Sequence, residues 1–215
     1  MKDLPLFTTQ NGIASLTLRE IPYTSKAYIL MQSSLSPKAL LEECRDFCRA
    51  VGAEYVYASG DEVVEEYPYH TTVVTMQCAK ACLPDSKLCL FPVQEQTVGH
   101  WKDIYNEKAS SVPNAAWMTD ADCKTMLQSG EGYFVHDGET LCGIGRVDAE
   151  EIKWVASCVP GMGADVLCAL ASIVPAETIR LQVADTNIKA MRLYERLGFV
   201  AVQSGRPWHC ILQPQ

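Results

Sequence analysis

The most constraining feature of this sequence is a regular alternation of strand and helix patterns in its last third. Runs of apolar and alternating residues predict strands at 141–147, 150–158 and 178–184. Apolar residues at helical spacing predict helices at 164–174 and 187–197. This order predicts a protein of the α/β (α+β) class, in which helices flank a central sheet.

The turn between the second of these strands and the first helix carries a possible ligand signal. It reads Pro160-Gly161-Met162-Gly163 and leads directly into the helix. Glycines let the backbone approach a ligand closely, and the N–H groups at a helix start bind phosphate. The motif is neither G-x-G-x-x-G nor a P-loop with its lysine, so dinucleotide and P-loop sites are disfavoured. A plain turn is the alternative interpretation.

The last predicted helix carries the second signal. It begins after Asn187, and Gly198 ends it. One face groups four side chains, Ala190, Leu193, Tyr194 and Leu197. The alternative role of Tyr194 is simple packing, in which its ring is buried and its hydroxyl is hydrogen-bonded within the protein.

Together these features carry a resemblance. The string N-x-x-A-x-x-L-Y-E-x-L-G-F, preceded by a strand, a G-x-G turn and a helix, resembles the GNAT superfamily of acyl-CoA-dependent N-acetyltransferases. The resemblance covers the region 88–212. It implies a mixed, mostly antiparallel central sheet flanked by helices, with acetyl-CoA (coenzyme A) as the acetyl donor. The implied reaction moves an acetyl group to a primary amine, for which we expect a small-molecule acceptor.

The resemblance also implies roles for individual residues. The turn and helix start would hold the CoA pyrophosphate through Gly161, Met162, Gly163, Ala164 and Asp165. The preceding strand would hold the pantetheine arm and the thioester through Val155, Ala156 and Ser157. Asn187 would contact the cofactor, and Tyr194 would protonate the departing thiolate. One departure is Cys158, which stands where the family has Arg or Gln, so one polar contact to the phosphates is missing.

The amine must lose a proton before or during its attack, which calls for a general base or a water chain. Glu151, at the start of the strand 150–158, occupies a place where some family members keep a catalytic glutamate. His136 and His209 are the alternatives. A solvated strand start is the non-catalytic interpretation of Glu151.

An internal comparison predicts that the first part of the chain is a degenerate half-repeat of the last part; the alternative interpretation is that two strand-strand-helix-strand segments share apolar periodicity. With a shift of 126, residues 15–58 align with 141–184 without a gap. We therefore predict two domains, a degenerate GNAT-like half-domain at 1–85 and a catalytic domain at 86–215. Leu35 and Pro37 stand where the second half has its glycines, and proline has no N–H, so the first half is expected to bind no CoA.

The remaining patterns predict further elements and the walls of the acceptor pocket. The elements are strands within 15–32, a helix at 36–51, a strand at 54–58, strands within 62–78, a strand at 88–94, helices near 97–110 and 119–128, a strand at 132–137, and strands near 199–203 and 208–212. The segments near 97–128 and the first half are expected to build the pocket walls.

Composition limits the partners and the compartment. The net charge of -8 disfavours nucleic acid and suits a cationic or neutral small molecule. No apolar run reaches bilayer length and no secretory signal is visible, so we expect no membrane partner and a cytoplasmic protein. The ten cysteines include two C-x3-C pairs, Cys44/Cys48 and Cys78/Cys82, which differ from a zinc knuckle and favour core packing without metal.

Two other functions stay open at this stage. One is a non-catalytic acyl-CoA sensor or assembly module, which is consistent with Cys158 at the place where the family has Arg or Gln. The other is a cysteine-rich metal protein. The sequence leaves open whether the chain is a monomer or a homodimer.

Overall fold

The computed structural model describes residues 2–214 and divides into two compact units. The first unit combines the chain up to Thr72 with the segment from Gly205 onward, and the second is Val73–Ser204. This differs from the expected division into 1–85 and 86–215. Strand β5 (Tyr69–Ala79) enters the second unit, and strand β11 (Val200–Leu212) returns to the first. Long-range strand pairing, which sequence patterns do not reveal, places the boundary.

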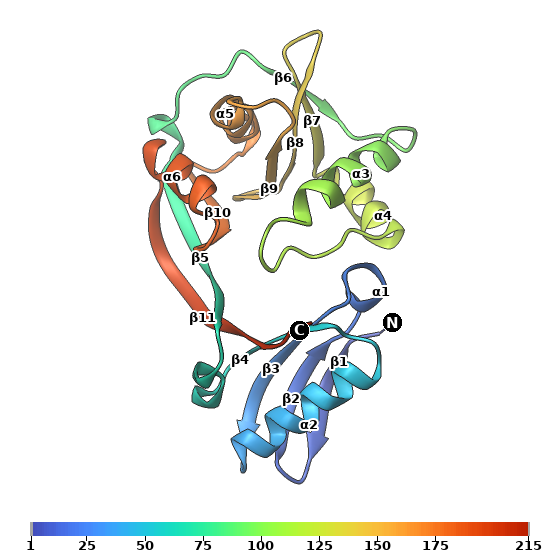
Figure 1. Cartoon of the computed structure of the whole chain (residues 1–215). Helices are drawn as coiled ribbons and strands as arrows, with labels where there is room; N and C mark the ends of the chain where they lie inside the picture. The colour runs from blue at the N-terminus through green and yellow to red at the C-terminus, as the bar shows by residue number, and fades with distance from the viewer. Residues whose placement is uncertain (1, 215) are drawn as a thin grey trace. The chain divides into compact units, whose positions relative to one another are not determined.

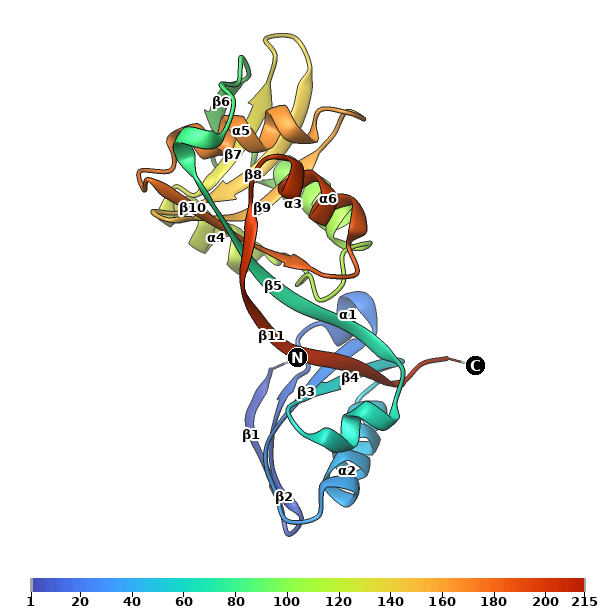
Figure 2. The ribbon, with the colours of Figure 1, turned by 90° about the vertical axis from the view of Figure 1, so that its left-hand side faces the viewer.

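The first unit is a sheet covered on one face by a helix. Its strands are β1 (Leu4–Thr9), β2 (Gly12–Thr17), β3 (Lys26–Ser34), β4 (Tyr55–Ser59) and the end of β11, in the order β1-β2-β3-β4-β11. The helices are α1 (Ile21–Thr24), α2 (Pro37–Ala50) and the 3-10 helix η1 (Glu62–Glu66). Helix α2 lies across the sheet (Figure 2), and its Leu40 and Leu41 belong to the same buried cluster as Ile29 and Met31 of β3.

The second unit is a larger sheet with helices on both faces. Its strands follow the order β5, β10 (Thr178–Ala184), β9 (Glu151–Ser157), β8 (Leu141–Val147), β7 (Gly132–His136) and β6 (Cys89–Pro92). The helices are the 3-10 helix η2 (Lys80–Cys82), α3 (Val98–Ala109), α4 (Asp120–Ser129), α5 (Gly163–Ile173) and α6 (Ile188–Arg196). Among the strand pairs described for this unit, only β9 with β10 is parallel, so the sheet is mixed and mostly antiparallel, as expected.

Helices on the two faces of this sheet bury separate apolar clusters. Helix α5 lies on one face and α3 and α4 lie on the other (Figure 1). Leu167 and Leu170 of α5 are fully buried against the sheet. Trp101 of α3 and Met126 of α4 are fully buried on the opposite face. Within 2–214, no helix combines the length and apolar character needed to span a bilayer.

Glycine at position 145 is required by the packing of α5 on β8. A Cβ atom there would lie 2.1 Å from the Leu170 Cδ1 atom. We expect Gly145→Ala to lower the free energy of unfolding by about 1–3 kcal/mol, because overpacking forces the helix away from the sheet. Gly99→Ala is the control, since nothing lies within 4 Å of its added Cβ. Urea denaturation measures both, and equal stabilities for the two variants would contradict this packing.

Candidate active site

Strands β9 and β10 pair for two residues and then separate. Glu151 pairs with Arg180 and Ile152 with Leu181. Beyond this point β9 keeps its pairing with β8 as far as Ser157, while β10 keeps its pairing with β5. The backbone N–H and C=O groups of β9 that face β10 therefore have no strand partner there. Such groups can donate to, or accept from, a ligand.

A β-bulge accompanies the separation of the strands. Trp154 lies opposite Arg146 and Ile152 lies opposite Val147, so Lys153 is the extra residue on β9. A bulge bends its strand and increases the local twist. This places the bend of β9 directly after Ile152, the last residue that pairs with β10.

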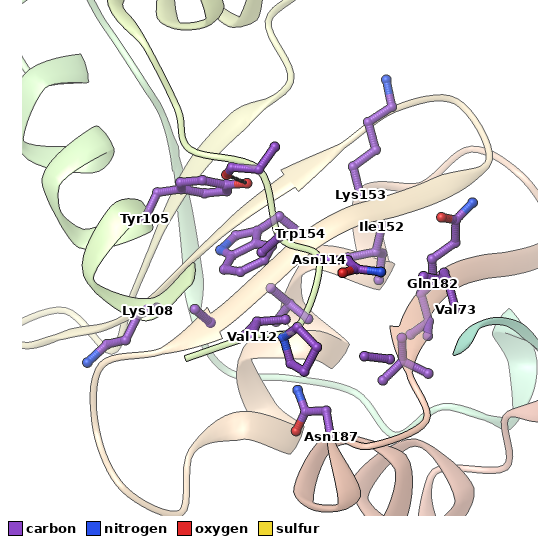
Figure 3. A pocket seen from close by; sticks show the side chains of 18 of the residues that line it. Val73, Tyr105, Lys108, Val112, Asn114, Ile152, Lys153, Trp154, Gln182 and Asn187 are labelled. Atoms are coloured by element: carbon purple, nitrogen blue, oxygen red, sulfur yellow. Dashed lines mark hydrogen bonds between the residues drawn. The ribbon is translucent and has the colours of Figure 1, made fainter. Parts of the chain in front are cut away.

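A cavity of about 310 Å³ opens between the separated strands. From the predicted residues it brings together Val155, Ala156, Asn187 and Tyr194. Its other walls, drawn in part in Figure 3, are Val73, Tyr105, Lys108, residues 112–116, residues 152–154 and residues 181–184. The segment 97–128 supplies Tyr105, Lys108 and residues 112–116 of this lining, and Val73 is the one described lining residue from the predicted half-domain 1–85.

Tyr194 reaches this cavity from the middle of α6. Its side chain is buried and packs against Phe199, with ring centroids 5.9 Å apart. Burial raises the pKa of the Tyr194 phenol to about 12. The hydroxyl therefore keeps its proton at neutral pH and can donate it.

The raised pKa of Tyr194 predicts a pH dependence of stability. As pH rises from 10.0 to about 12, the unfolded chain releases this proton while the folded chain keeps it. The contribution of Tyr194 to stability is therefore present below pH 10.0 and is lost as pH rises through that window. We expect the free energy of unfolding of the wild type to fall faster than that of Tyr194→Phe in urea denaturation across this range. Parallel pH profiles would contradict the assignment.

Asn187 caps α6 and lines the cavity at the same time. Its Oδ1 atom accepts a hydrogen bond from the Ala190 N–H at 3.3 Å. The cap satisfies one of the N–H groups that a helix start leaves open. It also fixes the side chain, and Nδ2 is the donor that can serve a ligand.

The glycine turn lies beside a second depression, of about 420 Å³. Gly161 has a φ of 89° with open space where a Cβ atom would stand, and Gly163 is the first residue of α5. Both line the depression together with Ala164, and the first N–H groups of α5 have no partner within the helix. Met162 packs against the core instead, and Asp165 is an exposed residue of the first turn.

Two cations line this depression beside Leu193 and Leu197, and sequence reasoning missed them. They are Lys189 and Arg196, which α6 brings beside the glycine turn. Burial raises the pKa of the Cys158 thiol, so Cys158 supplies no charge where the family has Arg or Gln. In the sequence, Lys189 and Arg196 are two basic residues about two helical turns apart, a pattern that any solvated helix face also shows.

The predicted general base lies outside the cavity. Glu151 is not among the described residues that line it, and its N–H donates to Asp148 Oδ1 at 2.9 Å. His136, on β7, packs against Phe91 of β6. His209 belongs to the first unit, where its Nδ1 lies 2.9 Å from the Tyr67 carbonyl oxygen. Ser157 is also outside the lining, and its hydroxyl donates to the Val159 carbonyl. The described lining contains no Asp, Glu or His.

The cysteines serve packing in the first unit. Cys44 and Cys48 are fully buried on the inner face of α2, and burial raises the pKa of both thiols to about 12. In the part of the chain that the structure describes, no three His, Cys, Asp or Glu side chains are grouped so that they could hold a metal ion.

Comparison with solved structures identifies the fold. A GCN5-related N-acetyltransferase from Sphaerobacter thermophilus superposes with a TM-score of 0.60 at 14% identity, covering 94% of this chain and 77% of that one. A tandem GNAT protein from the clavulanic acid biosynthesis pathway gives 0.55 at 11% identity, with 95% and 80% covered. A GCN5-related N-acetyltransferase from Anabaena variabilis gives 0.60 at 10% identity, with 93% and 59% covered. No family model matches the sequence, and no curated protein matches it. The chain has the GNAT fold.

Proposed function

We propose that this chain, with its GNAT fold, is an N-acetyltransferase that moves an acetyl group from acetyl-CoA to a primary amine of a small molecule. The observation that carries the proposal is the cavity between the diverging strands β9 and β10, with the protonated phenol of Tyr194 in its wall. The residues present fit the donor. The cavity suits the thioester end, and the depression at the glycine turn, with Lys189 and Arg196, suits phosphates.

The chain's own groups divide the chemical work. Acetyl-CoA, when bound, supplies the activated thioester. The N–H group of Val155, on the edge of β9 that faces away from β8, donates to the carbonyl oxygen as negative charge develops on it. The acceptor nitrogen bonds to the acetyl carbon while the carbon–sulfur bond breaks. Tyr194 gives its proton to the departing sulfur and recovers one from solvent.

The proton that leaves the amine goes to water in this account, because the described lining holds no carboxylate or imidazole. We therefore expect Glu151→Gln to keep kcat/KM within about threefold of the wild type, far from the 100-fold loss typical of a missing base. Steady-state kinetics across pH 6–9 measure this. A 100-fold loss that shrinks at high pH would restore Glu151 as the base.

The first unit is proposed to bind no acetyl-CoA. Its β3–α2–β4 segment repeats the β9–α5–β10 arrangement, since Lys26 pairs with Tyr55 in parallel as Glu151 pairs with Arg180. However, β3 and β4 stay paired as far as Leu30 and Ser59, so the strands do not open.

The turn before α2 is also closed to an anion. The N–H groups of Leu35 and Ser36 both donate to the Asn11 carbonyl, at 2.8 and 3.1 Å. Pro37, the first residue of α2, has no N–H to offer. These features support a degenerate half-domain.

Release of CoA thiol, followed with a thiol reagent, tests the function against a panel of primary amines. The proposal expects thiol release that depends on the amine, with the N-acetylated amine found by mass spectrometry. The second candidate is an acyl-CoA-binding module without catalysis, which the missing base favours. Binding of acetyl-CoA without thiol release for any amine would support that module.

A further inference from the structure

The wall of the cavity opposite β9 is a loop held firmly to α3. The buried Asn106 amide donates to the Met118 carbonyl at 3.1 Å and accepts from the Met118 N–H at 2.9 Å. The Tyr105 hydroxyl donates to the Ala116 carbonyl at 3.1 Å. Residues 112–116 are thereby fixed as a wall of the cavity.

Asn114 stands in this loop with an unusual backbone conformation. Its φ is 58°, in the left-handed region that asparagine tolerates better than most residues. The conformation costs free energy, and such costs gather at functional sites. It places a polar side chain in the lining of the cavity.

Two buried polar atoms of the lining have no hydrogen-bond partner. They are the Asn114 Oδ1 atom, an acceptor, and the Trp154 Nε1 atom, a donor. Figure 3 shows both side chains among those around the cavity, with Asn187 farther away in this view. Trp154 directly precedes Val155 on β9 and packs against Tyr105, with ring centroids 4.5 Å apart. A bound group that offers one donor and one acceptor would satisfy both atoms.

The charges around the cavity do not suit a polycation. Its described lining holds no carboxylate, and its two cations are already paired. The Lys153 Nζ atom lies 3.1 Å from Glu131 and 2.9 Å from Asp148, and the Lys108 Nζ atom lies 3.0 Å from Glu107. A second ammonium group on the acceptor would lose its water without gaining a counter-charge.

We propose that the acceptor is a small primary amine that carries a neutral amide group, whose N–H donates to Asn114 Oδ1 and whose carbonyl accepts from Trp154 Nε1. The inference rests on the proposed function and names the acceptor class of the same site. Of the acceptors that the net charge leaves open, it selects those whose second polar group is neutral and excludes those with a second ammonium group.

Three amines of similar size test the inference in the thiol-release assay. Alaninamide offers the donor and the acceptor, alanine methyl ester only the acceptor, and putrescine a second ammonium. We expect the kcat/KM of the wild type for alaninamide to exceed that for the other two by about tenfold, as one buried hydrogen bond allows.

Two variants separate the two hydrogen bonds. Asn114→Gly keeps the backbone conformation, since glycine adopts positive φ freely, and should reduce the amide-to-ester ratio to about one. Trp154→Phe should lower both activities about equally, because both compounds carry the carbonyl. Ser111 is exposed on the same loop, and Ser111→Ala is the control. It should change neither the amide-to-ester ratio nor the two activities.

The outcomes separate the inference from the function. Preference for putrescine, or an amide-to-ester ratio that survives in Asn114→Gly, would overturn the acceptor class while leaving the N-acetyltransferase in place. Acetyl-CoA binding without thiol release for any amine would overturn the proposed function and the inference with it.

Discussion

Tyr194→Phe is expected to lower kcat about 100-fold, because a positioned general acid contributes 10²–10⁴-fold to such a reaction. The affinity for acetyl-CoA should stay unchanged, since phenylalanine keeps the ring that packs against Phe199. Single-turnover kinetics with saturating acetyl-CoA would measure the chemical step directly. Calorimetric titration of the same variant would measure the affinity.

A second donor makes this prediction sharper. The thiolate of a more acidic thiol leaves without being protonated by an acid. Tyr194→Phe should therefore lose less activity with an acetylated aromatic thiol as donor than with acetyl-CoA. The ratio of kcat with the aromatic thioester to kcat with acetyl-CoA should therefore be smaller for the wild type than for Tyr194→Phe. Equal losses with both donors would mean that Tyr194 serves packing, the alternative that its burial also allows.

Gly163→Pro should weaken acetyl-CoA binding by at least about tenfold, the loss expected for a charge-assisted hydrogen bond. Gly163 is the first residue of α5, so proline there removes one N–H from the phosphate depression, and the backbone of Met162 (ψ 3°) must shift to accept the ring. Pro37 holds the same position at the start of α2. Calorimetric titration with acetyl-CoA measures the change in affinity.

Gly163→Ala is the matched control, because it adds a Cβ atom but keeps the N–H. That Cβ would lie 3.2 Å from the Leu193 Cδ2 atom, a contact that both variants share. Equal losses in the two variants would assign the effect to packing between α5 and α6. Full binding in Gly163→Pro would remove the glycine turn from the cofactor site.

The elements around the site could be predicted closely from the sequence because their signals are local. The predicted helix 164–174 is Gly163–Ile173, and the predicted helix 187–197 is Ile188–Arg196. The strands predicted near 199–203 and 208–212 are one strand, Val200–Leu212. Gly205 and Pro207 suggest a break, but strand formation depends more on context than on the propensity of single residues.

The site could be predicted only in part. Family resemblance placed Val155, Ala156, Asn187 and Tyr194, and all four lie in the lining of the cavity. The position of Glu151 along its strand could not show that its side chain stays outside the cavity. The bulge at Lys153, which no local pattern marks, decides where β9 turns.

The loop that faces the site was equally hidden. The region 97–128 was expected to build a wall, but the individual side chains depend on how Asn106 anchors the loop. The buried atoms of Asn114 and Trp154 come together from separate elements through tertiary packing. A single sequence carries no signal for such a pair.

The central claim is that the chain has one acetyl-CoA site, between β9, the glycine turn and α6. Amide hydrogen exchange of the full chain, with and without acetyl-CoA, locates the ligand most directly. We expect protection of residues 153–165 and 187–194 and no change at 28–37, where the first unit has its closed counterpart. Protection at 28–37, or no protection anywhere at saturating acetyl-CoA, would contradict the account.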